Sequence, residues 1–144
     1  MKTKLTGLLI LFSTAIISCD TDLQQDHNDL LTSTIWKGEQ TSLIAGEASK
    51  EPECRYTFHK NGDYTLEFGE MMSVTGKWKW VSKNEIFLEL KSFTFSGLQE
   101  NYKKGLNYNV RILEISKSKL KTLKKFETDA WDSGFAREAT FKPI

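Results

Sequence analysis

The fold is decided at residues 55–68, which read RYTFHKNGDYTLEF. Apolar and polar residues alternate on both sides of a central turn sequence, HKNGD. A period of two is typical of strands that have one face in a core and one in water. The stretch therefore predicts two antiparallel strands joined by a tight turn.

The turn length fixes which residues of this hairpin face each other. A three-residue turn that ends at Gly62 pairs Phe58 with Tyr64 and Tyr56 with Leu66, and it gives Gly62 the left-handed conformation that such turns require. A two-residue turn would set Phe58 against a threonine. Because a slip of one residue turns the whole apolar face over, we predict the three-residue turn.

A second hairpin follows at residues 78–88 and obeys the same logic. A three-residue turn pairs Trp80 with Ile86 and predicts a left-handed Asn84. The two hairpins then agree on one inner face, which is the pattern of a meander.

Similar alternation marks the other strands and predicts an all-β fold, an antiparallel up-and-down meander that closes into a barrel of about eight strands. The first strand is expected at Ile35–Ile44 with Trp36 near its start, and the last two at Leu120–Phe126 and Phe135–Phe141. Further inner positions are expected at Val74, Gly76, Trp78, Leu88, Leu90, Leu106, Tyr108, Val110 and Ile112.

The N-terminal residues have the pattern of an export signal. Lys2 and Lys4 precede an apolar run from Leu5 to Ile17, whose length of about 13 residues suits a signal-peptide core and is shorter than the roughly 20 that span a bilayer. The run ends in the sequence IISC at residues 16–19, which resembles the lipobox of bacterial lipoproteins. The resemblance implies cleavage before Cys19, lipidation of Cys19 and attachment to a membrane. The alternative is a plain secretory leader with an incidental cysteine.

These observations divide the chain into a lipoprotein signal peptide at 1–18, an acidic tether at 19–30 and one β domain at 31–144. The tether is polar and is expected to be flexible, with Asn28 capping a short turn. Its acidic residues resemble the sorting signals of Bacteroidetes-type lipoproteins, which implies the cell envelope, at the outer membrane, on its periplasmic or outer side. The alternative is a solvated spacer.

Charge and cysteine content exclude several classes of protein. The chain has 20 Lys and Arg against 19 Asp and Glu, and without Lys2 and Lys4 the basic count falls to 18. A nucleic-acid-binding protein needs a clear basic excess, so no nucleic-acid partner is expected. With Cys19 lipidated, Cys54 has no partner for a disulfide and is expected to be a partly buried strand residue.

The strands also resemble a known family. Trp36, the segment 56–64 and the segment GKWKW at 76–80 are similar to the bacterial lipocalin-like domain of the calycin group. The resemblance implies a barrel that binds a small apolar or amphipathic molecule, and it implies that Arg137 lies across Trp36.

No catalytic motif is present, so we expect no enzyme activity and no cofactor. His27, His59 and Cys54 form a weak metal set, and no metal site is expected. His59 is expected to face outward beside Asp63. Lys117, Lys119 and Lys121 share one strand face, which is a patch for an anionic partner or, more simply, a solvated face.

Two functions remain open. The first is a binding module whose ligand contacts inner side chains, and the second is an interaction or structural module whose barrel is filled by its own aromatic residues. The volume of the interior distinguishes them, while the ligand and any protein partner are not specified by the sequence. The ligand-binding residues of the first reading are Tyr56, Phe58, Tyr64, Leu66, Trp78, Trp80, Ile86, Leu88 and Tyr108.

Overall fold

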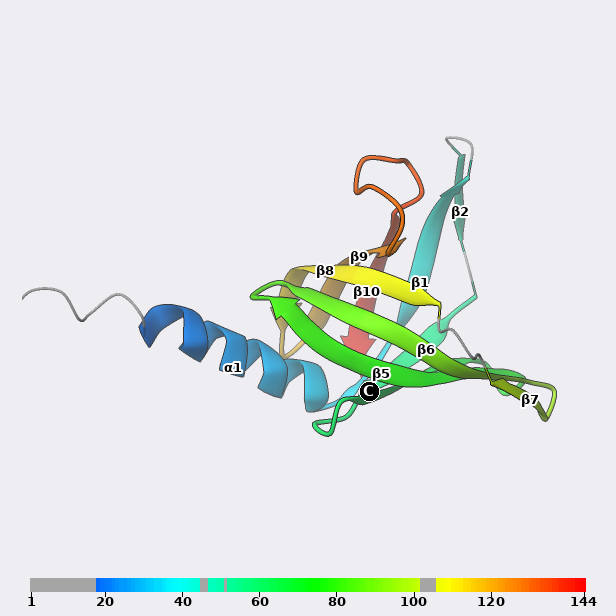
Figure 1. The fold of residues 1–144 in the computed structure, drawn as a ribbon, viewed down its shortest axis with the longest axis horizontal. Coiled ribbons are helices and arrows are strands. Elements are labelled where there is room, and N and C mark those ends of the chain that lie inside the picture. The colour runs from blue at the N-terminus through cyan, green and yellow to red at the C-terminus, as the bar shows by residue number, and fades with distance from the viewer. Residues whose placement is uncertain (1–17, 45–46, 51, 102–105) are drawn as a thin grey trace, which may run out of the picture.

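A computed structural model describes residues 18–44, 47–50, 52–101 and 106–144, which form ten strands and one helix (Figure 1). The predicted signal peptide lies outside these residues, except for Ser18. The elements are α1 (Ser18–Thr32), β1 (Ile35–Ile44), β2 (Glu47–Lys50), β3 (Cys54–Phe58), β4 (Asp63–Phe68), β5 (Met72–Ser82), β6 (Glu85–Phe95), β7 (Leu98–Asn101), β8 (Asn107–Ser116), β9 (Lys119–Phe126) and β10 (Arg137–Pro143).

The strands form a closed antiparallel barrel, as predicted. The order β10-β9-β8-β6-β5-β4-β3-β1 places strands that follow one another in the chain side by side, and β1 also pairs with β10 to close the ring of eight. In this closing ladder Trp36 lies opposite Pro143 and Thr41 lies opposite Glu138. The last strand begins two residues later than the sequence indicated, whereas β1 has the predicted bounds.

Two of the ten strands are short extensions of the barrel wall. β2 and β3 both pair with β1, and β7 and β8 both pair with β6. β2 and β3 therefore lie one after the other along the same side of β1, and β7 and β8 lie one after the other along the same side of β6. Figure 1 shows that the β1–β2 hairpin and the tip formed by β5, β6 and β7 project from the barrel.

The first hairpin has the predicted register. Phe58 lies opposite Tyr64 and Tyr56 opposite Leu66. The amide of Gly62 donates to the carbonyl of His59 at 3.0 Å, and Gly62 has a φ of 85°. Glycine adopts this left-handed conformation without the steric cost that other residues incur. The predicted three-residue turn and the predicted conformation of Gly62 are therefore both confirmed.

The second hairpin has the predicted pairing but a different turn. Trp80 lies opposite Ile86, yet Ser82 already lies opposite Glu85, so Val81 is an extra residue on β5. The prediction of a left-handed Asn84 is wrong, because Ser96 is the non-glycine residue with a positive φ in the described part of the chain. A β-bulge at Val81 accommodates the extra residue of this hairpin, which we expected a left-handed residue in the turn to accommodate.

A second bulge lies in β6 and changes which residues face inward. Gly76 lies opposite Leu90 and Thr75 opposite Ser92, so Lys91 is the extra residue. Beyond the bulge the alternation shifts by one, and Phe93 joins the inner face instead of Ser92. Gly76 itself permits close packing, because a Cβ at this position would collide with the carbonyl oxygen of Glu89 and the ring of Tyr64.

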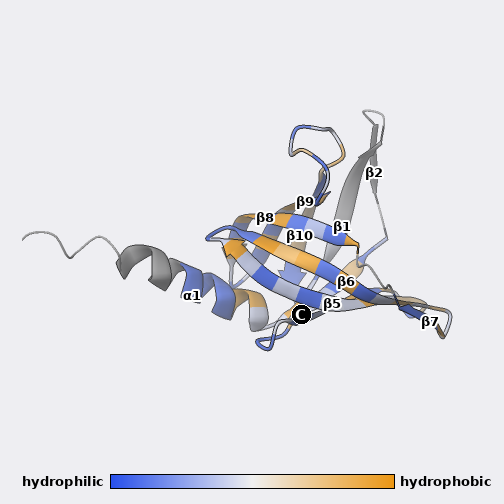
Figure 2. Cartoon of the chain, viewed as in Figure 1, coloured by the Kyte–Doolittle hydropathy of each residue, from blue (hydrophilic) through white to orange (hydrophobic). Residues whose placement is uncertain are grey.

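The core lies inside the barrel. Figure 2 shows apolar and polar residues alternating along β5 and β6, as expected for walls with one buried face. Leu106 is an exception to the prediction, because it precedes β8 and is 43% exposed. The buried core residues include Trp36, Cys54, Tyr56, Phe58, Tyr64, Leu66, Val74, Trp78, Ile86, Leu88, Leu90, Val110, Ile112, Leu120, Ala139 and Phe141.

The segment predicted as a flexible tether is instead part of the α1 helix. Asp20 and Asp22 lie in the first turns of this helix. Its other end is fixed to the barrel by Leu31, which is 1% exposed, and the hydroxyl of Thr32 donates to the carbonyl of Asn28 at 2.8 Å. Asn28 therefore lies within the helix and does not cap a turn. Packing of the last turn supplies the stability that a polar helix of this length lacks by itself.

We expect Trp78→Ala to lower the free energy of unfolding by about 3–5 kcal/mol, because it removes a buried aromatic side chain from the core. Lys77→Ala, on the outer face, removes an exposed ion pair with Asp63 and should cost far less, because pairs of exposed charges contribute little to stability. Urea unfolding of both variants measures the difference. Equal losses would show that the inner and outer faces of β5 are wrongly assigned.

Candidate functional site

The interior of the barrel is the site that the sequence predicted for a ligand. Aromatic rings from neighbouring strands contact one another there: Tyr56 stacks on Phe58 with ring centroids 5.5 Å apart, and Phe58 meets Trp78 edge to face at 5.6 Å. Phe141 of β10 meets Tyr56 edge to face at 5.5 Å. These geometries are the favoured ones for aromatic pairs, so the rings form a packed cluster.

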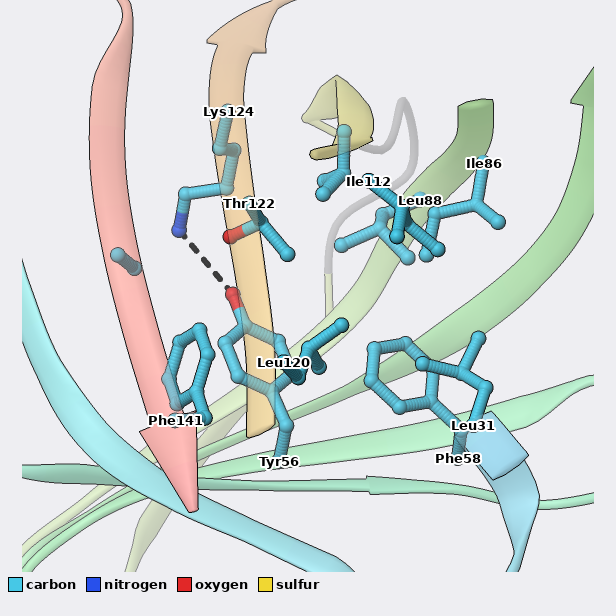
Figure 3. A pocket seen from close by; sticks show the side chains of 12 residues that line it. Leu31, Tyr56, Phe58, Ile86, Leu88, Ile112, Leu120, Thr122, Lys124 and Phe141 are labelled. Carbon is cyan, nitrogen blue, oxygen red and sulfur yellow. Dashed lines mark hydrogen bonds between the residues drawn. The ribbon is translucent and has the colours of Figure 1, made fainter. Parts of the chain in front are cut away.

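A small cavity remains beside this cluster (Figure 3). Its volume is about 20 Å³, which is room for about one water molecule. Of the predicted ligand contacts, Tyr56, Phe58, Ile86 and Leu88 line it. The other residues that line it are Leu31, Val110, Ile112, Leu120, Thr122, Lys124, Ala139 and Phe141.

The remaining predicted contacts lie elsewhere. Tyr64, Leu66 and Trp78 are buried in the core but do not line the cavity. Trp80 is partly buried beneath α1, where its Nε1 donates to Oδ1 of Asn28 at 3.3 Å. Tyr108 packs against Phe126, with ring centroids 4.8 Å apart. The structure therefore brings four of the nine predicted residues together at one cavity.

Lys124 is the residue of the interior that the sequence reasoning missed. Its Nζ donates to the hydroxyl of Tyr56 at 3.1 Å, as Figure 3 shows, and lies 5.7 Å from the Tyr56 ring centroid. It also lies 5.4 Å from the ring centroid of Tyr108. The signal was present in the sequence, because Lys124 has the same strand parity as Leu120 and Thr122, which face the core.

The hydroxyl of Tyr64 is held in its neutral form. Burial raises the pKa of Tyr64 well above its ordinary value near 10, and the nearby Tyr108 and Glu89 raise it further. Gly76 leaves the space that the Tyr64 ring occupies. The phenol is therefore a packed core group with no tendency to ionise at neutral pH.

One end of the barrel is closed by the helix. Leu31 points into the cavity, and the Nε1 of Trp36 donates to the Leu31 carbonyl at 3.0 Å. Lys60 of the β3–β4 turn forms an ion pair with Asp29 at 3.3 Å. His27 lies beside Trp80, with ring centroids 6.3 Å apart, so the last two turns of α1 contact the barrel.

The expected contact between Arg137 and Trp36 is wrong. Trp36 lies opposite Pro143, whereas Arg137 lies opposite Lys124 at the other end of β10. Six residues of strand separate the two positions, about 20 Å, which an arginine side chain does not bridge.

A buried lysine holds the loop between β9 and β10. Lys125 is 8% exposed, and its Nζ donates to the carbonyls of Phe126, Glu127 and Asp129 at 3.3, 3.4 and 2.6 Å. The ring of Trp131 lies 5.0 Å from this ammonium and 4.2 Å from the Arg111 guanidinium. Two cation–π contacts thus fix the position of the Trp131 ring.

The outer wall carries paired charges. Lys119 and Lys121 form ion pairs with Glu114 and Glu138, each at 2.7 Å, which fits the solvated face that was one of the two readings for these lysines. His59 bonds to Asp63 through the backbone, while the carboxylate of Asp63 pairs with Lys77, which lowers its pKa.

An open groove lies on the outer wall over β1, β9 and β10. Its volume is about 920 Å³, and its lining includes both Lys and Glu side chains. Lys37 in the groove is paired with Glu53 at 3.0 Å, so the groove does not concentrate charge of one sign.

The described residues contain no group of three or more His, Cys, Asp and Glu side chains placed to hold a metal ion. Within the same part of the chain, no helix has both the length and the apolar character needed to cross a bilayer. Comparison with known protein families, with curated proteins and with solved structures found no match.

We expect the stability of the protein to fall as the pH rises above about 10, because Tyr64 loses its proton there in the unfolded chain while the folded chain retains it. Tyr64→Phe removes this contribution. The free energy of unfolding, measured by urea titration between about pH 9 and pH 11, should therefore fall less steeply in the variant than in the original protein. Parallel curves would contradict the buried position of this hydroxyl.

Proposed function

We propose that this protein is a lipid-anchored envelope protein whose barrel is filled by its own side chains and which acts through its outer surface as an interaction module. Of the two functions that the sequence left open, this is the one without an interior ligand.

The volume of the interior carries the proposal. Ligand pockets in proteins usually have volumes of roughly 300–1,000 Å³. The cavity here has about 20 Å³, because Phe58, Phe141 and Leu31 occupy the centre and one end of the barrel. An eight-stranded barrel is just wide enough to be filled in this way. A bound molecule would have to displace packed side chains, and filling their space with a ligand gives no gain in buried apolar area.

The anchor follows from the N-terminal sequence and is supported by the position of α1. The sequence IISC at residues 16–19 resembles a lipobox, and Cys19 is the second residue of α1. A helix of 15 residues is about 22 Å long. Its first residues are thus well separated from the barrel, to which the last turn is fixed by Leu31. Attachment at Cys19 then leaves the barrel free to contact partners.

A second candidate is the binding of a small amphipathic molecule, and one observation favours it. Lys124 and Thr122 place a cation and a hydroxyl at an otherwise apolar cavity. Such a combination suits an apolar molecule with an anionic group. However, the Nζ of Lys124 already donates to the Tyr56 hydroxyl. The small volume of the cavity also argues against this second function.

Titration with lipophilic probes distinguishes the two candidates. For a packed barrel we expect no saturable change in the emission of Trp78 or Trp80 with fatty acids or naphthalene-sulfonate dyes. Leu88→Ala removes three carbon atoms beside the cavity and serves as the matched variant for small apolar probes such as xenon, which the enlarged cavity is expected to admit. Saturable binding to the original protein that Leu88→Trp abolishes, with the fold intact, would establish the ligand-binding function instead.

Labelling with radioactive palmitate tests the anchor. In a Gram-negative host, Cys19→Ala is expected to leave the chain uncleaved and unlabelled. Cys54→Ala is the control, because it removes the other cysteine, which is buried in the barrel, and should be labelled normally. Label on the Cys19→Ala chain would refute lipidation at this residue.

A further inference from the structure

The inner face of the barrel continues beyond the barrel onto an exposed ledge. By register, Phe68 of β4 lies opposite Met72 of β5, Met72 opposite Phe95 of β6, and Phe95 opposite Leu98 of β7. Residues directly opposite each other in an antiparallel sheet share one face. These four apolar side chains therefore form a row across four strands, which we call the ledge row.

The ledge row exists because of the bulge at Lys91. Without the extra residue, Phe93 and Phe95 would point to the outer face of the wall. Their rings are stacked with centroids 6.4 Å apart, and Phe93 packs against the core. Phe95 is 51% exposed and Leu98 is 77% exposed. The row thus begins at the core and ends at a large apolar side chain in water.

The strand at the end of the row has an open edge. In the described part of the chain β7 pairs with β6 alone, and all four of its residues are exposed. Exposed edges usually carry proline or lysine, which discourage pairing with another chain. β7 reads Leu98-Gln99-Glu100-Asn101 and has neither residue.

The turn before β7 shows which backbone groups face the open edge. Ser96 and Gly97 have φ values of 49° and 80°, the conformation of a two-residue type I′ hairpin turn. In such a hairpin the flanking residues Phe95 and Leu98 bond to each other, and the bonding alternates along the strand. The N–H and C=O groups of Gln99 and Asn101 therefore point away from β6.

A hydrogen bond between two turns also holds the end of the sheet formed by β5, β6 and β7. The amide of Ser96 donates to the carbonyl of Met71 at 2.8 Å, which ties the β6–β7 turn to the β4–β5 turn. Met71 is 66% exposed and adds apolar surface at the same place. A preformed edge of this kind spares a partner the cost of ordering it.

We propose that β7 is a docking edge for an extended segment of a partner protein, which adds a strand beside Leu98–Asn101 and extends the ledge row. This inference rests on the proposal that the protein acts through its outer surface. Backbone groups of Gln99 and Asn101 supply the hydrogen bonds, and the exposed ledge row supplies the side-chain contacts. Strand addition at an open edge is a common mode of peptide recognition.

The side chains of β7 define the chemistry of the segment. Leu98 and Glu100 lie on the ledge face, Glu100 opposite Phe93. A residue paired with Leu98 gains most if it is apolar, and a residue paired with Glu100 gains most if it is Lys or Arg. In an antiparallel segment the basic residue comes first and the apolar residue follows two positions later. The partner therefore carries the pattern basic–x–apolar in an extended stretch.

A second copy of this chain fits the edge less well. Antiparallel pairing of two β7 strands through their outward-facing groups sets Gln99 against Gln99 and therefore Leu98 against Glu100, so neither the apolar nor the acidic side chain finds a matching partner. A heterologous segment with the stated pattern satisfies both.

The test uses the full mature chain, purified from membranes and placed in lipid nanodiscs. The probes are fluorescein-labelled peptides Gly-Thr-B-Thr-Z-Thr-Gly, in which B and Z take every natural amino acid. Fluorescence anisotropy is expected to show saturable binding that is strongest when B is Arg or Lys and Z is a large apolar residue. Absence of saturable binding across the whole set would overturn the proposal.

Two variants of one residue separate edge pairing from adhesion to the apolar row. Gln99→Pro removes a donor at the open edge, where proline is tolerated, and should weaken binding about tenfold. Gln99→Ala keeps the N–H and should bind within about twofold of the original protein. Circular dichroism verifies that both variants are folded. Equal binding by the two would show that β7 does not pair with the peptide.

A charge reversal tests the predicted pattern. Glu100→Lys should change the preferred residue at B from basic to acidic and leave the preference at Z unchanged. An unchanged preference at B contradicts the proposed register. Dimers of the original chain that Gln99→Pro dissociates would assign the edge to a second copy and overturn the peptide. The probe titration of the interior is independent, so a failed peptide test leaves the packed barrel standing.

Discussion

The structure depends on the closure of β1 onto β10. Gly38 of β1 lies opposite Phe141 of β10, and a Cβ on Gly38 would collide with the carbonyl of Thr140 and with Phe141 itself. Because position 38 has no side chain, the two strands approach closely and the Phe141 ring turns into the barrel against Tyr56. The contact between Gly38 and Phe141 closes the barrel and also places the Phe141 ring in its interior. In this sequence the closure of the barrel and the filling of its interior therefore depend on the same contact.

Because side chains fill the interior, we look for the functional surface on the outside of the barrel. The barrel has eight strands in its wall, a number at which side chains alone can fill the space. Here aromatic residues on β3, β4, β5 and β10 do so, with Leu31 of α1 closing one end. Among the described residues, β7 at the periphery combines an edge that no other strand pairs with and exposed apolar side chains. Interaction through this periphery is therefore the function that we propose.

Local patterns predicted the wall of the barrel well, because strand alternation and turn length are short-range properties. The turn at Gly62 has one sterically favourable register, and the pairing of Tyr56 with Leu66 followed from it. The bulges escaped prediction, since an extra residue at Val81, Lys91 or Leu113 leaves no mark in composition and depends on packing against neighbouring strands. The bulge at Lys91 is the reason that the ledge row was not foreseen.

The candidate site was predicted less completely than the wall. Four of the nine expected residues line the cavity, because parity tells which side chains point inward but not at which height along the barrel they meet. Lys124 was overlooked although its parity matched Leu120. The helix escaped prediction because its polar sequence has little tendency to fold by itself and is stabilised by Leu31 in the barrel. The contact of Arg137 with Trp36 was wrongly predicted because it depends on the pairing of β1 with β10, which local sequence patterns do not reveal.

The pairing of β1 with β10 also has a consequence for the order of folding. The ladder joins positions 36 and 143, so it cannot form until both of these distant segments of the chain are available. Closing so long a loop is entropically costly, and sheets built on distant pairings fold slowly. Until then β1 has β3 on one side and an unpaired edge on the other, which is the condition in which β proteins aggregate. A chain of this design therefore depends on protection of the β1 edge until β10 is available to pair with it.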